Sequence, residues 1–210
     1  MGSPEGVGKA DERPARAVRV DAFYMDKHEV TVEAYNAFAA ATGREAKRQA
    51  CGGAPGCPAV YVTWFEAKAC CEFYAKRLPT EAEWEKAARG GSSSAYAHGD
   101  EPDRLGDYAW FWDNSGRKLH PVGGRRPNAY GLYDMYGNAL EWAADWYSAF
   151  YYSDGAAENP AGPAEGDEKV IRGGSAYTTA DMCRAASRMK SSPHTPYSGK
   201  GFRCAVSAAR

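Results

Sequence analysis

The segment from Asn128 to Tyr147, NAYGLYDMYGNALEWAADWY, most restricts what this chain can fold into, because it joins a possible metal-binding turn to an aromatic core segment. It offers two carboxylates and two small residues at Asp134, Gly137, Ala139 and Glu141. Calcium takes roughly six to eight oxygens, from carboxylates and from backbone carbonyls that a glycine-containing loop can turn inward. The pattern therefore indicates a calcium site with charge from the two acids. On local spacing alone, two solvated loop acids are the favoured alternative.

Four further motifs accompany this segment along the chain. They are FYMDKHEVT at Phe23 to Thr31, KRLPTEAEWEKAARGG at Lys76 to Gly91, VIRGGS at Val170 to Ser175, and GFRC at Gly201 to Cys204. In this order, and together with GLYDMYGNALEW, they resemble the formylglycine-generating enzyme, or sulfatase-modifying factor, family over nearly the whole chain. The resemblance implies an α+β fold of the C-type-lectin-like kind, loop-rich, with short helices and a mixed or antiparallel β-sheet. It also implies a structural calcium held by Asp134, Gly137, Ala139 and Glu141.

Length and charge restrict the remaining classes of function. The chain has 210 residues and a formal net charge of −1 at pH 7, and we expect a single domain over residues 1–210. No basic block is present to bind nucleic acid or an anionic membrane. No apolar run is long enough to span a bilayer, and the first residues lack a secretory signal. We therefore expect neither a nucleic-acid nor a membrane partner, while the oligomeric state and any sequence upstream of Met1 stay open.

Six cysteines suggest disulfides, although their spacing does not fix the pairing. Cys71 and Cys204 match residues that pair in the family, so the resemblance implies a disulfide between them. Cys51 and Cys57 are close enough in sequence to form a local bridge, and the other two cysteines have no assignment. This usage favours an oxidising compartment, periplasmic or extracellular, whereas buried reduced thiols are the alternative.

Helices are predicted only in the first half of the chain. Apolar periodicity and capping residues place them at 32–41, 64–75 and 81–89. The second and third begin with capping boxes, in which Thr63 pairs with Glu66 and Thr80 with Glu83. Short strand-like runs are expected at 18–23, 168–172 and 202–207. Long loops over 92–130 and 148–167 need a further restraint, which calcium and disulfides would supply.

The segment after VIRGGS decides whether the resemblance extends to catalysis. Enzymes of the family bind copper(I) through two cysteines, one three residues after the serine of Gly-Gly-Ser and one five residues further on. Here Ser175 is kept, but Thr178 stands at the first cysteine position, and copper(I) selects sulfur over a hydroxyl. Cys183 stands at the second position when counted from Ser175. Counting back from GFRC places it beside a structural cysteine of the family, and we favour this second count.

Either count leaves one thiol in the segment, so we expect neither copper binding nor the oxidase activity of the family. An oxidase of altered mechanism is the alternative enzyme class. It would use Ser175 and Cys183 as catalytic residues and would need Cys70 or another thiol close to Cys183. The four histidines show no spacing that places two imidazoles on one metal.

A binding domain is the function that remains. In catalytic relatives the segment between Ser175 and Gly201 forms the substrate groove, and tyrosine and arginine are enriched at binding hot spots. We therefore predict that a peptide or protein ligand binds this C-terminal loop through Tyr177, Arg184, Arg188, His194 and Tyr197. Two further hypotheses stay open. One is a ligand-binding protein diversified by a retroelement, with this loop as its variable surface, and the other is a subunit that modulates an active enzyme of the family.

Overall fold

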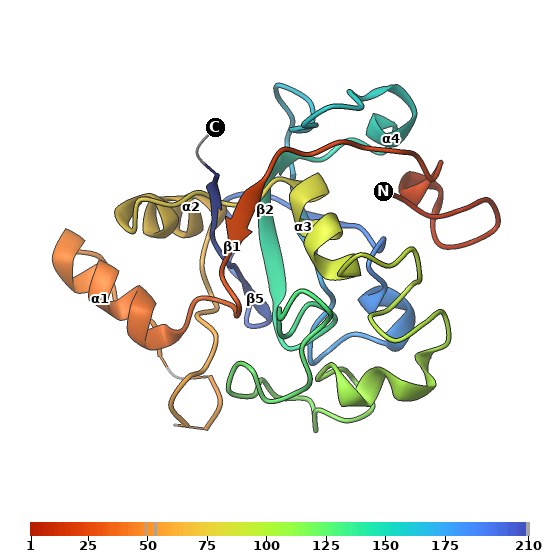
Figure 1. The fold of residues 1–210 in the computed structure, drawn as a ribbon. Helices are drawn as coiled ribbons and strands as arrows, with labels where there is room; N and C mark the ends of the chain where they lie inside the picture. The colour runs from red at the N-terminus through yellow and green to blue at the C-terminus, as the bar shows by residue number, and fades with distance from the viewer. Residues whose placement is uncertain (49, 53, 209–210) are drawn as a thin grey trace.

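Short helices and strands joined by long loops make up the fold in the computed structural model, which describes residues 1–48, 50–52 and 54–208 (Figure 1). The α-helices are α1 (Val32–Thr42), α2 (Trp64–Phe73), α3 (Glu81–Arg89) and the four-residue α4 (Tyr151–Asp154). Short 3₁₀ helices are η1 (Ala10–Glu12), η2 (Pro102–Asp107) and η3 (Ala180–Cys183). The strands are β1 (Phe23–Met25), β2 (Leu140–Trp146), β3 (Lys169–Arg172), β4 (Met189–Ser191), β5 (Lys200–Gly201) and β6 (Ala205–Ser207).

Threonine caps begin the three longer helices, as predicted. Both capping boxes form, with each threonine accepting from the third helical amide and each glutamate accepting from the capping amide. Helices α1 and α3 end at Gly43 and Gly90, which adopt the left-handed conformation that glycine tolerates. Helix α2 is two residues shorter than predicted. It ends at Phe73 because Ala75 has a positive φ of 55° and turns the chain away.

The main sheet has four strands in the order β4-β3-β2-β5, antiparallel except for the parallel pair of β2 with β5. A second sheet pairs β1 with β6. Figure 1 shows α1 and α2 on one side of β2 and α3 on the other. The architecture is therefore the predicted α+β fold with a mixed sheet and short helices. Strand β2 was missed because its first four residues are all buried, which hides the alternation typical of a half-buried strand.

Two large hydrophobic clusters and a smaller one around Leu119 and Ala139 fill the interior of the described chain. Trp142 of β2 lies in the first cluster, with Tyr35 and Phe38 of α1 and the two cysteines of α2. Trp84 of α3 lies in the second, together with Tyr136 and Cys183. No helix among the described residues is long and apolar enough to cross a bilayer.

Two disulfides restrain the loops. Cys71 of α2 bonds Cys204, which confirms the pairing that the resemblance implies, and Cys51 bonds Cys57 as a local bridge. Cys70 and Cys183 are free and buried. The two bridges are consistent with an oxidising compartment.

We predict that replacing Cys71 and Cys204 by alanine lowers the free energy of unfolding by about 5 kcal/mol, because the bridge closes a 133-residue separation. The same change at Cys51 and Cys57 removes a bridge that spans a separation of only 6 residues, and it lowers the free energy of unfolding by about 2 kcal/mol. Urea unfolding of the two double variants measures both losses. Equal losses would show that loop closure does not set the contribution of the longer bridge.

Candidate functional site

Glu141 of β2 lies at the centre of the predicted calcium segment and is fully buried. Its two carboxylate oxygens accept three hydrogen bonds from Arg203, at 2.8 to 3.0 Å. Trp84 of α3 adds a fourth, because its Nε1 donates to Oε2 at 2.8 Å. Glu141 is therefore neutralised by Arg203, and this carboxylate holds three distant segments together.

Asp134 lies a few residues before β2 and is buried with 1% exposure. Its φ of 61° is in the left-handed region that aspartate tolerates better than most residues. The amide of Gly123 donates to Oδ2 at 2.7 Å. The other oxygen, Oδ1, is buried and accepts from no amide, hydroxyl or basic side chain among the described residues. The neighbouring carboxyl of Glu29 can donate to Asp134 when it is protonated, whereas an ionised pair of these acids needs a cation.

Glu29, between β1 and α1, is a third buried carboxyl at this place, and the sequence analysis did not single it out. It is 2% exposed. The amide of Ala139 donates to its Oε1 at 3.1 Å, and the side chain of Asn138 lies 3.5 Å from Oε2. Its only sequence signal is the motif FYMDKHEVT, which carries no spacing relation to the loop that it contacts.

Buried acids outnumber buried bases in this group of four side chains, formed by Glu29, Asp134, Glu141 and Arg203 and called here the acidic cluster. Burial, followed by the charges of Asp134 and Glu141, raises the pKa of Glu29 well above its usual range. Burial also raises the pKa of Asp134, although the amide of Gly123 opposes that shift. One guanidinium faces three carboxyls, so a cation near Asp134 would offset the excess of negative charge.

The loop between these acids is tightly packed. A side chain at Gly137 would place a Cβ only 2.2 Å from the carbonyl oxygen of Trp110, so only glycine fits. The next amide, of Asn138, donates to that same carbonyl at 2.7 Å. Among the residues that the structure describes, no three His, Cys, Asp or Glu side chains converge to hold a metal ion. The predicted calcium set needs only two such side chains, because Gly137 and Ala139 would supply carbonyls.

The segment after β3 brings Thr178 and Cys183 into contact, with the hydroxyl oxygen 3.5 Å from Sγ. The contact is compatible with both counts made in the sequence analysis, so the structural position of Cys183 favoured there stays a prediction. The amide of Ser175 donates to Thr178 Oγ1 at 2.7 Å, and the Ser175 side chain accepts from the amide of Tyr177 at 3.2 Å. Ser175 is 1% exposed, so its hydroxyl is a turn-forming group rather than a reactive one.

The two free thiols lie in different parts of the core. Cys70 belongs to the cluster around Trp142, and Cys183 belongs to the cluster around Trp84. Burial raises the pKa of each thiol to about 12, so both stay protonated at neutral pH. A protonated thiol is a poor nucleophile, so neither cysteine is activated by its surroundings.

Three aromatic side chains of the predicted ligand loop lie near the surface. Tyr197 is 47% exposed. A Cβ at Gly199 would lie 2.8 Å from the ring of Tyr177 and 3.2 Å from that of Tyr197, so both rings flank this glycine. The ring of His194 packs against exposed Phe65, with 4.9 Å between the centroids. Tyr177 and Tyr197 thus form one aromatic surface, which we call the tyrosine face, and His194 with Phe65 form a separate aromatic pair.

The two arginines that were predicted to bind the ligand make ion pairs within the protein instead. Arg184 makes a bidentate ion pair with buried Glu12, at 2.7 and 2.9 Å. Arg188 is 2% exposed and makes a bidentate ion pair with Glu81 of α3, at 2.7 and 2.9 Å. Their guanidinium groups are used inside the protein, so we remove Arg184 and Arg188 from the ligand-binding set.

The chain is similar in sequence to a known family of proteins over nearly its whole length. The sequence model of the Sulfatase-modifying factor enzyme 1-like domain matches residues 1–208. The chain belongs to this family. It is 32% identical to the formylglycine-generating enzyme of Streptomyces coelicolor, over 97% of the chain and 84% of that enzyme. It is 37% identical to the inactive Cα-formylglycine-generating enzyme 2 of Bos taurus, over 73% of the chain and 51% of that protein.

Two other relatives show that the domain occurs in different settings. The chain is 37% identical to the serine/threonine-protein kinase pkn1 of Chlamydia pneumoniae over 94% of its own length, but it spans only 35% of that kinase. The solved structure of Treponema denticola variable protein 1 superposes with a TM-score of 0.87 at 29% identity, covering 99% of this chain and 91% of that one. Proteins with different names therefore share the family and the fold of this chain.

The acidic cluster predicts a pH dependence of stability in chelator. Because the pKa values of Glu29 and Asp134 are raised in the folded state, that state binds protons more strongly than the unfolded chain does. The free energy of unfolding is therefore highest near the ordinary carboxyl pKa of about 4 and falls as pH rises through the folded values. We expect Asp134→Asn to reduce this fall, as measured by urea midpoints between pH 5 and pH 8.

Glu165→Gln is the matched control, because Glu165 is exposed. It should reproduce the pH profile of the parent. If Asp134→Asn also reproduces that profile, Asp134 is not titrating inside the cluster.

Proposed function

We propose that this protein is a non-oxidising member of its family, stabilised by calcium, that binds a peptide or protein ligand on the tyrosine face. The observation that carries the proposal is the hydroxyl of Thr178 in contact with the buried thiol of Cys183. A two-sulfur copper(I) site needs a second thiol at that contact, and Thr178 offers oxygen instead. Copper therefore does not fit the side chains of this segment.

The other hydrogen bonds of this segment favour a structural role for Thr178. Thr178 Oγ1 accepts from the amide of Ser175 and donates to its carbonyl at 3.1 Å. The hydroxyl of Thr178 is therefore used by the hydrogen bonds of its own turn rather than being free for chemistry. The name of the inactive bovine relative agrees with loss of activity within this family.

We predict that the parent protein leaves a CxPxR peptide unchanged in mass when it is incubated with copper(I) and oxygen. Thr178→Cys places a second sulfur beside Cys183 and should bind copper(I) at least about tenfold more tightly than the parent. Competition with a copper(I) chelator measures the affinity, and mass spectrometry follows the peptide.

Thr179→Cys is the matched control, because Thr179 is the next residue and is exposed. Its added thiol should leave copper(I) affinity at the level of the parent. An aldehyde formed by the parent protein would overturn the proposal in favour of an oxidase of altered mechanism.

Ligand binding on the tyrosine face is supported by exposure and by chemistry. Tyr61 adds a third ring, because its amide donates to the carbonyl of Tyr197 at 3.1 Å and its side chain is 56% exposed. Tyrosines give large contact area at low entropic cost, with a hydroxyl for hydrogen bonding. Exposed rings of this kind suit a peptide or protein surface. A retroelement-diversified binding protein would use the same face, since the Treponema structure named as a variable protein shares this fold.

Calcium is supported by the acidic cluster. In the part of the chain that the structure describes, Asp134 Oδ1 accepts from no amide or basic side chain, and three buried carboxyls share one arginine. We propose Asp134, with the carbonyls of Gly137 and Ala139, as the calcium-binding group. Glu141 is neutralised by Arg203 and fixes the end of the loop, while Glu29 lies close enough to Asp134 to act with it if a cation displaces its proton.

We predict that calcium at about one hundred times its dissociation constant raises the melting temperature by roughly 5 to 10 °C over the protein in chelator. Asp134→Asn should abolish this increase, because it removes the charge of this carboxylate. The comparison uses Asp134→Asn rather than a change at Glu141, since loss of Glu141 would leave Arg203 buried without a partner. Differential scanning calorimetry measures the shift.

Asp145→Asn is the control for removal of a buried carboxyl. Asp145 of β2 is 2% exposed and accepts from the amide of Glu81 rather than lying in the acidic cluster. It should keep the full response to calcium. If Asp134→Asn responds to calcium as the parent does, the proposed ligand set is misplaced.

A further inference from the structure

A loop that begins at Trp112 extends the surface of the tyrosine face. The amide of Trp112 donates to the carbonyl of Thr178 at 2.9 Å, one residue after Tyr177. Further along this loop, Leu119 lies with Ala176 in the small hydrophobic cluster, and Tyr177 packs against that cluster. The loop therefore contacts both neighbours of Tyr177 in the chain, so it borders the tyrosine face.

An arginine on this loop presents a positive charge that has no acidic partner within the protein. Trp112 is 40% exposed, and the guanidinium carbon of Arg117 lies over its ring, 4.2 Å from the centroid. A cation–π contact leaves the N–H donors of a guanidinium available for hydrogen bonds. Among the residues that the structure describes, Arg117 forms no ion pair, and the exposed Asp113 of the same loop is not within ion-pair distance of it. The donors of Arg117 are therefore available to a ligand.

The backbone of the loop holds Arg117 in place. Its φ of 56° is in the left-handed region, which a long side chain rarely adopts. Its amide donates to the hydroxyl of Ser115 at 3.0 Å, and that hydroxyl donates to the carbonyl of Ala176 at 2.6 Å. Tyr61, which adds a ring beside Tyr197, has a similar φ of 60°. Unfavourable backbone conformations of this kind cluster at ligand-binding positions, which makes both residues candidates for direct contact with a ligand.

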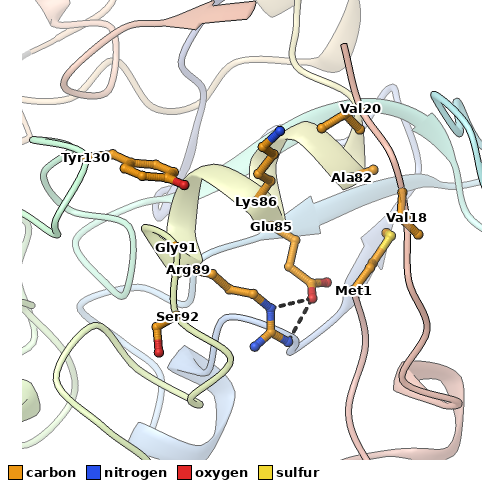
Figure 2. A pocket seen from close by; sticks show the side chains of 10 residues that line it. All are labelled: Met1, Val18, Val20, Ala82, Glu85, Lys86, Arg89, Gly91, Ser92 and Tyr130. Carbon is orange, nitrogen blue, oxygen red and sulfur yellow. Dashed lines mark hydrogen bonds and ion pairs between the residues drawn. The ribbon is translucent and has the colours of Figure 1, made fainter. Parts of the chain in front are cut away.

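Figure 2 shows a contrasting arginine, beside a hollow next to α3. The guanidinium of Arg89 is directed at the carboxylate of Glu85, with 2.9 Å between Nη2 and Oε1. Arg184 and Arg188 are used in the same way, each by a buried acid. Arg117 has an indole ring as its neighbour where these three arginines have a carboxylate. A carboxylate from another molecule can therefore complete its contacts.

We infer that the peptide or protein ligand of the tyrosine face carries an aspartate or glutamate that binds Arg117, next to an aromatic or apolar residue that packs on the tyrosine rings. This inference rests on the proposed function and adds the charge of the ligand to it. A carboxylate can accept two parallel hydrogen bonds from one guanidinium. The exposed rings of Trp112, Tyr61 and Tyr197 supply apolar contact area around that ion pair. Charge complementarity therefore favours an acidic segment of the partner over a basic one.

A displayed library of random seven-residue peptides, selected against the full chain, tests the charge of the ligand. Peptides that still bind the variant Tyr197→Ala are discarded, because they bind outside the tyrosine face. In the peptides that remain, aspartate and glutamate should be enriched at least about threefold over the unselected library, beside an aromatic or apolar residue.

Reversal of the charge at position 117 should reverse this preference. The same selection against Arg117→Glu should enrich lysine and arginine, because a negative side chain there repels a carboxylate. Peptides that depend on Tyr197 but show no acidic enrichment would overturn the inference and leave the proposed function standing, because the tyrosine face would still bind peptides. Failure to select any peptide that depends on Tyr197 would overturn the proposed function as well.

One selected peptide, capped at both ends, then tests the contact itself by isothermal titration calorimetry. Arg117→Gln should raise the dissociation constant about tenfold, and so should an amide in place of the acidic side chain of the peptide. Both changes together should raise it no further than either alone, because they remove the same contact. Arg117→Gly should give the same loss as Arg117→Gln, since glycine tolerates the positive φ.

Arg44→Gln is the matched control, because Arg44 is exposed and its guanidinium lies over the ring of Phe38, 5.0 Å from the centroid, after α1 rather than on this surface. It should leave the dissociation constant unchanged. If the losses from Arg117→Gln and from the altered peptide add in full, the carboxylate does not meet Arg117, and the inference is overturned.

Discussion

The buried ion pair between Arg203 and Glu141 is the interaction on which the rest of the structure depends. Arg203 comes from GFRC near the end of the chain, and besides Glu141 it donates to the carbonyl of Tyr133 and to two carbonyls just after β1. Trp84 of α3 donates to the same carboxylate. Four of the five sequence motifs thus meet at one charged centre. Removing either partner would leave a buried charge uncompensated, at a cost of about 3 to 5 kcal/mol.

The fifth motif, VIRGGS, contains a second buried arginine that joins it to α3 and to the segment after η3. Arg172 at the end of β3 is fully buried, bonds Glu85 of α3 at 2.7 Å, and donates to three successive carbonyls at residues 185–187. Arg188 continues the network through Glu81. The strands of the main sheet are two to seven residues long. Because these strands are short, many loop carbonyls have no partner in the sheet, and guanidinium groups donate hydrogen bonds to them instead. These charged hydrogen bonds hold the long loops in place.

The helices were predictable from sequence, because a capping box is local and the residues that form it lie three apart. The disulfide of Cys71 with Cys204 came from resemblance, since spacing alone left the pairing open. Strand β2 was missed because burial on both faces hides its alternation, and Glu29 was missed because its role depends on a loop far away in sequence. The arginines at 184 and 188 were misplaced similarly. An arginine that suits a binding surface also suits a buried ion pair, and only the positions of Glu12 and Glu81 decide between them.

The buried framework and the turn at Thr178 are energetically separate. Neither Arg203 nor Arg172 contacts Thr178, whose hydroxyl is satisfied within its own turn by Ser175. The neighbouring thiol of Cys183 fits the core as a small buried group. A substitution at position 178 therefore costs the fold little. A framework fixed by buried ion pairs can in this way keep its shape and its exposed aromatic surface while the side chains of this turn vary.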